Sequence, residues 1–137
     1  MSTEPVRALK RDRVGHEKEM TTEAALYRDG TLVANVFTDC DNDFHGLRGR
    51  VLIVALDGAG FAVGVSEVMR CTTRGGTLDI FTPSSGRETF IQKFPDDVAA
   101  RVVSLDIYQA HDDNLGAVRN RAIGMARDVV AVAAIIL

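Results

Sequence analysis

The sequence has no tryptophan, and only 6% of its 137 residues are aromatic. Proteins that stack sugars or single-stranded nucleic acid need exposed aromatic side chains. The composition therefore argues against such a stacking platform. The chain also has only two cysteines, Cys40 and Cys71. Two thiols exclude a disulfide-rich scaffold, and free thiols are typical of a reducing compartment, so we expect a cytoplasmic protein.

Long hydrophobic runs are missing too. The longest wholly apolar run, residues 129–137, falls well short of the roughly 20 residues that a membrane-spanning helix needs. The first 20 residues lack the apolar stretch of a secretory signal. We therefore expect no association with a membrane and no export by that route.

Basic residues do not predominate, since the formal net charge is −3. Affinity for nucleic acid comes mostly from clustered Lys and Arg, so the balance predicts no nucleic-acid partner. The one basic cluster, Arg7 to Arg13, lies in a polar segment, and we expect residues 1–22 to form a flexible arm. The length of the chain suits a single domain.

What the sequence does contain is a series of short strand patterns. Residues 51–56 are a continuous, mostly branched apolar run, which is typical of a strand buried on both faces. A turn at 57–60 then leads into alternation at Phe61, Val63 and Val65, so we expect a central hairpin with strands at 48–56 and 61–69. Asp29-Gly30 between alternating runs predicts a second hairpin, with strands near 23–28 and 31–38.

Further strand patterns follow at about 77–82, 87–93 and 99–110, each bounded by turn residues. About seven strands without crossover helices favour a mainly β domain over residues 23–110. We therefore predict an antiparallel β-sandwich of immunoglobulin-like or C2-like architecture. Membership of the immunoglobulin family is not predicted, because Arg101 and Val103 stand where a tyrosine and a cysteine are expected.

The C-terminal segment, residues 111–137, has a helical pattern instead. Its apolar residues are spaced alternately by three and four positions, which predicts one amphipathic helix from about residue 115. The stripe supplies more apolar surface than one sheet edge usually covers, so we expect part of it to contact another chain, most simply in a homodimer. The predicted contact residues are Leu115, Val118, Ala122, Met125, Val129, Val132 and Ile136. A helix packed wholly on its own sandwich, and a last strand over 129–137, remain alternatives.

Carboxylates suggest a cation site in one loop. Asp39, Asp41 and Asp43 have the alternate spacing that surrounds calcium with oxygen ligands. Phe44 and Arg50 stand where an EF-hand needs Gly and Glu, so that motif is rejected. If neighbouring turns share one end of the sandwich, Asp96 and Asp97 join this site. The alternative is a solvated turn, because such turns favour Asp and Asn.

Other candidate sites carry weaker signals. Cys40, His45 and Cys71 suit zinc or a cysteine nucleophile by residue type, but their spacing matches no zinc pattern. Gly58, Gly60 and Gly64 imitate a dinucleotide-binding turn, although strand-like alternation follows them. Ser66 lacks the setting of a nucleophile elbow, and His111 is a possible base or simply the end of a strand.

The sequence thus favours a non-enzymatic interaction and assembly module that self-associates through its C-terminal helix. A calcium-type cation module is the alternative. A small enzyme or nucleotide-binding domain that uses the 58–64 turn is the third possibility, since no nucleophile–base pair stands out and no catalytic residue is assigned.

Overall fold

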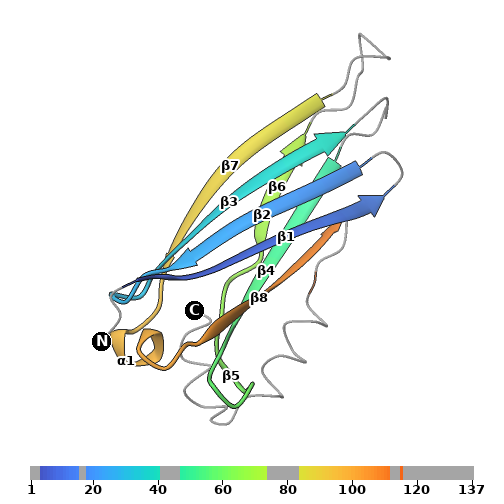
Figure 1. Cartoon of the computed structure of the whole chain (residues 1–137). Helices are drawn as coiled ribbons and strands as arrows, with labels where there is room; N and C mark the ends of the chain where they lie inside the picture. The colour runs from blue at the N-terminus through green and yellow to red at the C-terminus, as the bar shows by residue number, and fades with distance from the viewer. Residues whose placement is uncertain (1–3, 16–17, 41–46, 74–83, 112–114, 116–137) are drawn as a thin grey trace.

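The structure is a computed structural model of the chain, and it describes residues 4–15, 18–40, 47–73, 84–111 and Leu115. Within these residues it contains two antiparallel β-sheets and one short α-helix (Figure 1). The predicted antiparallel sandwich is confirmed. The immunoglobulin-like or C2-like assignment stays a prediction.

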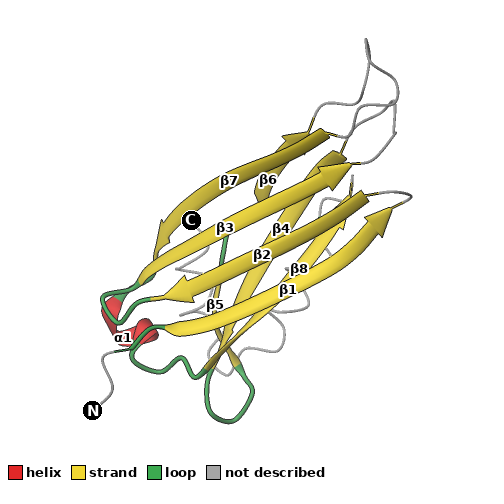
Figure 2. Cartoon of the chain, turned by 45° about the horizontal axis from the view of Figure 1, so that its top comes forward, coloured by secondary structure: helices red, strands yellow, loops and turns green. Residues whose placement is uncertain are grey.

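The first sheet has the strand order β1-β2-β3-β7. Every neighbouring pair is antiparallel, and the four strands are long, which makes this sheet the more regular layer (Figure 2). Its strands are β1 (Val6–Gly15), β2 (Lys18–Leu26), β3 (Thr31–Cys40) and β7 (Ser84–Lys93).

The second sheet is built around β4 (Leu47–Leu56). One edge of β4 pairs with β8 (Ser104–His111), and the other edge pairs first with β6 (Met69–Thr73) and then with β5 (Ala62–Val65). Between β7 and β8 lies the helix α1 (Asp96–Ala99). β4 is therefore the central strand, as its continuous apolar run predicts.

The main hydrophobic core lies between the two sheets. Alternate residues of β3, namely Leu32, Ala34 and Val36, point inward and are buried. Val51 and Ile53 of β4 meet them from the second sheet. Successive side chains of a strand point to opposite faces of the sheet. Every second residue of β3 and of β4 therefore points into the core between the sheets.

The Asp29-Gly30 hairpin is confirmed, and its geometry explains its sequence. Gly30 has φ +94°, its N–H donates to the Tyr27 carbonyl over 2.9 Å, and its own carbonyl accepts from the Phe94 N–H over 2.8 Å. Asp29 accepts from the Thr31 N–H, which lowers the pKa of its carboxyl. The turn thus connects β2 to β3 and fixes the segment that leads from β7 to α1.

The N-terminal segment differs from the prediction of a flexible arm, because residues 6–15 form β1 and residues 18–26 form β2. β1 is an edge strand with one wet face. Its inward residues Val6, Ala8 and Val14 are half-buried against the core, while arginines occupy the outer face. The charged residues of the outer face made the alternation of β1 difficult to recognise in the sequence.

The expected strand 61–69 is shorter in the structure: β5 ends at Val65, residues 66–68 lie outside the strands, and β6 begins at Met69 and continues to Thr73, beyond the expected end. A register irregularity beside Leu56 also places Val63 in the main core, although Val65 faces the opposite side of the sheet. The expected strand 99–110 begins later, at Ser104, because residues 96–99 form α1. The predicted strand 77–82 lies outside the described residues.

One side chain joins the open edges of the two sheets. The Gln109 amide of β8 donates to the Lys10 and Met20 carbonyls, over 3.2 and 3.3 Å, and to Asp12 Oδ2 over 2.9 Å. Its oxygen accepts from the buried Thr22 hydroxyl over 2.6 Å. β8 and β1 therefore meet through Gln109, without a backbone ladder between them in the described residues.

Candidate functional site

Ser66 has a structural role. It is fully buried, its Oγ accepts from the Ile53 N–H over 2.9 Å and donates to the Glu67 carbonyl, and its N–H donates to the Ile53 carbonyl. The side chain thus replaces a backbone partner of β4 at the point where β5 ends. A serine held in this way is not available as a nucleophile, in agreement with its sequence setting.

Cys40 and Cys71 are brought into the same buried cluster, and neither forms a disulfide. Burial raises the pKa of the Cys71 thiol to about 11, and the nearby Glu88 carboxylate adds to the rise while Arg50 opposes it. A neutral, buried thiol is a poor nucleophile and a poor metal ligand. His45, the third residue of the zinc hypothesis, lies outside the described residues.

His111 ends β8, as expected. Its Nδ1 accepts a hydrogen bond of 3.0 Å from the Arg48 N–H, so this nitrogen carries no proton. The ring therefore holds the start of β4 in place.

The 57–60 turn joins two antiparallel strands, β4 and β5, rather than a strand and a helix. Asp57 Oδ1 accepts from the Ala59 and Phe61 N–H groups, and the Asp57 carbonyl accepts from the Gly60 N–H. The Ala59, Gly60 and Phe61 N–H groups are thus bonded within the turn, and the turn leads into a strand instead of the helix N-terminus that binds a pyrophosphate. The dinucleotide hypothesis for Gly58 to Gly64 is therefore not supported by this geometry.

The five predicted calcium ligands do not share one end of the sandwich. Asp39 pairs with Ser85, whereas Thr31, at the other end of β3, pairs with Lys93, just before Asp96 and Asp97. Eight residues of strand separate these ends by about 27 Å. Figure 1 likewise shows α1 at the end of β3 opposite its arrowhead.

The expectation that Asp96 and Asp97 join the Asp39 loop is thus wrong. Asp41 and Asp43 lie outside the described residues, and the described ones contain no group of three metal-ligating side chains. A cation site formed by Asp39, Asp41 and Asp43 alone stays a prediction.

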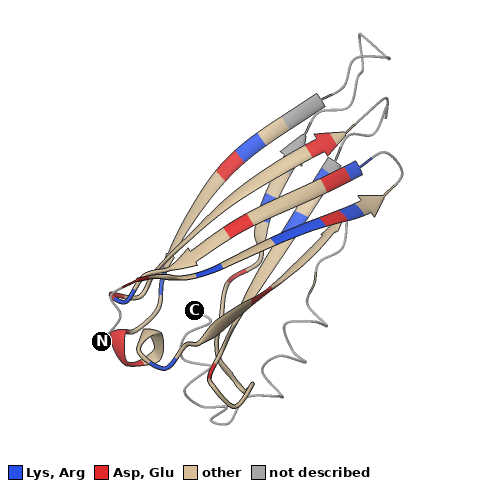
Figure 3. Cartoon of the chain, viewed as in Figure 1, with Lys and Arg blue, Asp and Glu red and all other residues tan. Residues whose placement is uncertain are grey.

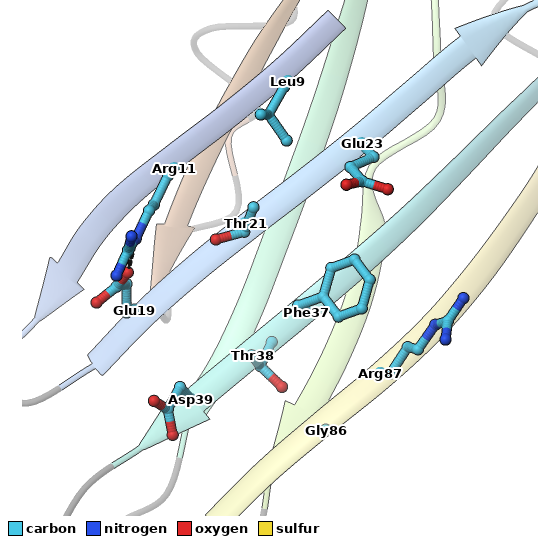
Figure 4. Close-up of a pocket in the computed structure, with 10 residues that line it drawn as sticks. All are labelled: Leu9, Arg11, Glu19, Thr21, Glu23, Phe37, Thr38, Asp39, Gly86 and Arg87. Atoms are coloured by element: carbon cyan, nitrogen blue, oxygen red, sulfur yellow. Dashed lines mark hydrogen bonds and ion pairs between the residues drawn. The ribbon is translucent and has the colours of Figure 1, made fainter.

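The outer face of the first sheet carries an open groove of about 940 Å³ (Figure 4). Arg11, Thr21, Phe37 and Arg87 form one cross-strand row through it, one residue from each strand. The Arg87 guanidinium carbon lies 5.1 Å from the centre of the Phe37 ring, within the range of a cation–π contact. The sequence analysis missed this groove, because half of it is built by β1 and β2. Its signal was the alternation of charged and apolar residues from Val6 to Val14.

Charges of both signs lie side by side on this face (Figure 3). Arg11 pairs with Glu19, and this contact lowers the pKa of the Glu19 carboxyl. Glu23 and Asp39 also line the groove, but no cysteine, serine or histidine is among its described lining residues. The described lining of the groove is therefore mostly charged and polar, around the Phe37 ring.

A second apolar cluster lies on the outer face of the second sheet. It contains Leu52 and Val54 of β4, Ala62 and Val65 of β5, and Leu115. Leu115 is only 5% exposed, so it packs on its own sandwich rather than being free to contact another chain. The other predicted contact residues, Val118, Ala122, Met125, Val129, Val132 and Ile136, lie outside the described residues.

Comparison with known proteins adds no functional assignment, because the chain matches no family model, no curated protein and no solved structure. Across the described segments, no helix is both long enough and apolar enough to span a membrane.

Proposed function

We propose that the protein is a non-enzymatic interaction and assembly module that forms a homodimer through the apolar stripe of its C-terminal segment. The observation that carries this proposal is the position of Leu115. The first residue of the stripe lies on the outer surface of the second sheet, away from the core between the sheets. The apolar sequence that follows therefore starts at the surface of the sandwich.

The chemistry of the described side chains supports a non-catalytic role. Ser66 is bonded to backbone groups, both thiols are buried, and His111 Nδ1 is occupied by a backbone N–H. Each of these side chains is therefore buried or already engaged with the backbone, whereas a catalytic nucleophile or base needs solvent access and an activating partner.

The end of the stripe supplies the contact. Residues 129–137 are apolar throughout, and a charged or polar residue is absent from this part of the sequence. Contiguous apolar surface of this kind is stable in water only when another surface covers it. A symmetric homodimer is the simplest arrangement that covers it with an identical stripe.

The proposal is tested by light scattering after size-exclusion chromatography. Val129→Asp places a charge in the stripe, and we expect the dimer to dissociate to a monomer at micromolar concentration. Asn120→Asp, which lies off the stripe, is the matched control and should leave the mass unchanged. A Val129→Asp protein with the same mass as the unaltered chain contradicts self-association through the stripe.

A further inference from the structure

We propose that the open edge of β7 binds an extended acidic segment of another protein, which joins the first sheet as a further strand beside β7. The proposal goes beyond self-association, because it assigns a second surface and a different kind of partner. The bound segment pairs with β7 through backbone hydrogen bonds and places acidic side chains opposite Arg87 and Lys93. Addition of a strand to a sheet edge is a common mode of peptide recognition.

The backbone groups on this edge belong to every second residue of β7. The Phe94 N–H donates to the Gly30 carbonyl over 2.8 Å, and these two residues continue the β3–β7 register. Hydrogen-bonded pairs alternate along an antiparallel ladder, so the even-numbered residues of β7 bond to β3. Within the described part of the chain, no strand pairs with the opposite edge. The N–H and C=O groups on that edge are those of Arg87, Thr89, Ile91 and Lys93.

The two edge strands of the first sheet differ in how well they are protected against such pairing. The outer face of β1 carries three arginines, and its register shifts between Arg13 and Gly15. Charges and bulges of this kind keep an edge strand from pairing further. β7 instead pairs with β3 along its whole length without a shift, and its residues 89–92 are uncharged. Ile91 is 70% exposed, so β7 is the edge that can accept another strand.

The charges of β7 disfavour a second copy of the chain as the occupant. Two antiparallel registers give two β7 strands their longest overlap while edge-facing residues stay opposite each other. One register places Glu88 opposite Glu88 of the second copy. The other places Thr89 opposite itself, so Arg87 lies diagonal to Lys93 of the second copy. Like charges directly opposite are destabilising, and long side chains also interact at diagonal positions.

Acidic residues in a different partner turn this repulsion into attraction. Arg87 and Lys93 are exposed, and they lie on one face of β7 with Ile91 between them. An antiparallel strand therefore fits when it has an acidic residue opposite each cation and an apolar residue opposite Ile91. The contact with the Phe37 ring places the Arg87 guanidinium at the border of the outer groove (Figure 4). The acidic side chain opposite Arg87 is then bound at this border.

Two synthetic peptides test the proposal in NMR titrations of the isotope-labelled full chain. The first is acetyl-Glu-Thr-Val-Thr-Thr-Thr-Glu-amide, and the second has Lys in place of both Glu. We expect the acidic peptide to bind at least about fivefold more tightly than the lysine peptide. It should shift the amide signals of Thr89 and Ile91 more than those of Phe90 and Gln92, because only the former two N–H groups face the open edge.

Variants of the protein test the charges and the backbone separately. The double variant Arg87→Glu, Lys93→Glu changes two exposed side chains and should prefer the lysine peptide. Ile91→Pro removes one N–H from the open edge, where proline is tolerated, and should weaken binding of the acidic peptide at least about fivefold. Leu9→Pro is the matched control, because Leu9 is 66% exposed on the other edge strand. Binding to this control should be unchanged.

The outcomes separate this inference from the dimer proposal. Equal binding of the two peptides, binding of neither, or a preference that charge reversal leaves unchanged overturns strand addition at β7. A halved mass of the Ile91→Pro protein in light scattering means that a second copy occupies the edge, which also overturns it. Val129→Asp should bind the acidic peptide as well as the unaltered chain does, whether or not the dimer dissociates. Weaker binding by this variant contradicts a separate surface at β7.

Discussion

Among the glycines in the described part of the chain, Gly30 has the least room for a side chain. Its φ is +94°, and a Cβ at this position would lie 1.9 Å from the Phe94 carbonyl oxygen. Gly60 has a similar φ of +86°, but a Cβ there would meet no atom within 4 Å. The two glycines therefore separate backbone strain from steric overlap.

We expect Gly60→Ala to lower the free energy of unfolding by about 1–2 kcal/mol, the cost of a left-handed conformation for an L-residue. Gly30→Ala should lose clearly more, because the Phe94 backbone must also move. Urea unfolding of both variants measures the difference. Equal losses would mean that the β2–β3 turn moves away from Phe94 without cost.

Cys71 predicts a dependence of stability on alkaline pH. The thiol titrates at about 8.5 in an unfolded chain, but burial raises its pKa to about 11 in the folded protein. Between these values the folded state holds a proton that the unfolded state has lost. Stability is therefore full below about pH 8.5 and falls as the pH rises towards 11.

Cys71→Ala should remove this part of the pH dependence. Lysines and tyrosines titrate in the same range, so the measured quantity is the difference between the two proteins in urea unfolding at pH 8 and pH 10.5. Parallel pH profiles would show that the Cys71 thiol contributes nothing to the dependence.

At the scale of elements, Ser66 explains why the expected strand ends early. β5 ends at Val65, directly before Ser66, and the chain pairs with β4 again only from Met69, in β6. At Ser66 itself the hydroxyl replaces the backbone partner of the Ile53 N–H. A hydroxyl that takes the place of a ladder hydrogen bond leaves no mark in hydrophobic periodicity, so alternation alone predicted a single strand.

Ser66→Ala should therefore lower the free energy of unfolding by about 1–3 kcal/mol, because the Ile53 N–H is left buried without its acceptor. Ser104→Ala is the control, since Ser104 is an exposed residue of β8. Thermal melting of both variants is sufficient. A Ser66→Ala protein as stable as the control would show that the N–H finds another acceptor.

The strands themselves differed in how well the sequence predicted them. β4 was predictable because both of its faces are buried. A short, continuous apolar run is the pattern that such a strand requires. β1 was not predictable, because an edge strand buries one face only partly and its outer residues Arg7, Arg11 and Arg13 read as a solvated tail. The alternation of Val6, Ala8 and Val14 with charged residues was the feature of the sequence that could have predicted this strand.

At the scale of the molecule, the sequence predicted the sandwich but not which turns lie together at each end of it. Strand lengths and turn residues specify antiparallel layers. They do not specify which turns share an end, since that depends on the register between strands distant in sequence. For this reason Asp96 and Asp97 were expected beside Asp39, whereas the β3–β7 register separates them by the length of the sheet.

Gln109 connects β8 of the second sheet to β1 and β2 of the first, so its removal should weaken the contact between these strands. Gln109→Ala removes the acceptor of the buried Thr22 hydroxyl and the donor to the Lys10 and Met20 carbonyls. We expect a loss of about 1–3 kcal/mol in the free energy of unfolding and faster amide exchange in β1 than in β7. Thr89→Ala, which breaks an exposed hydrogen bond to Asn35, is the control. Uniformly faster exchange in both strands would contradict a local role for Gln109.

Self-association is most directly tested by sedimentation equilibrium of the unaltered full chain over a range of concentrations. We predict a reversible equilibrium between the 14.8 kDa monomer and a species of twice that mass. A single 14.8 kDa species at every concentration up to about 100 μM, where even a weak dimer would be populated, would contradict the proposed assembly function.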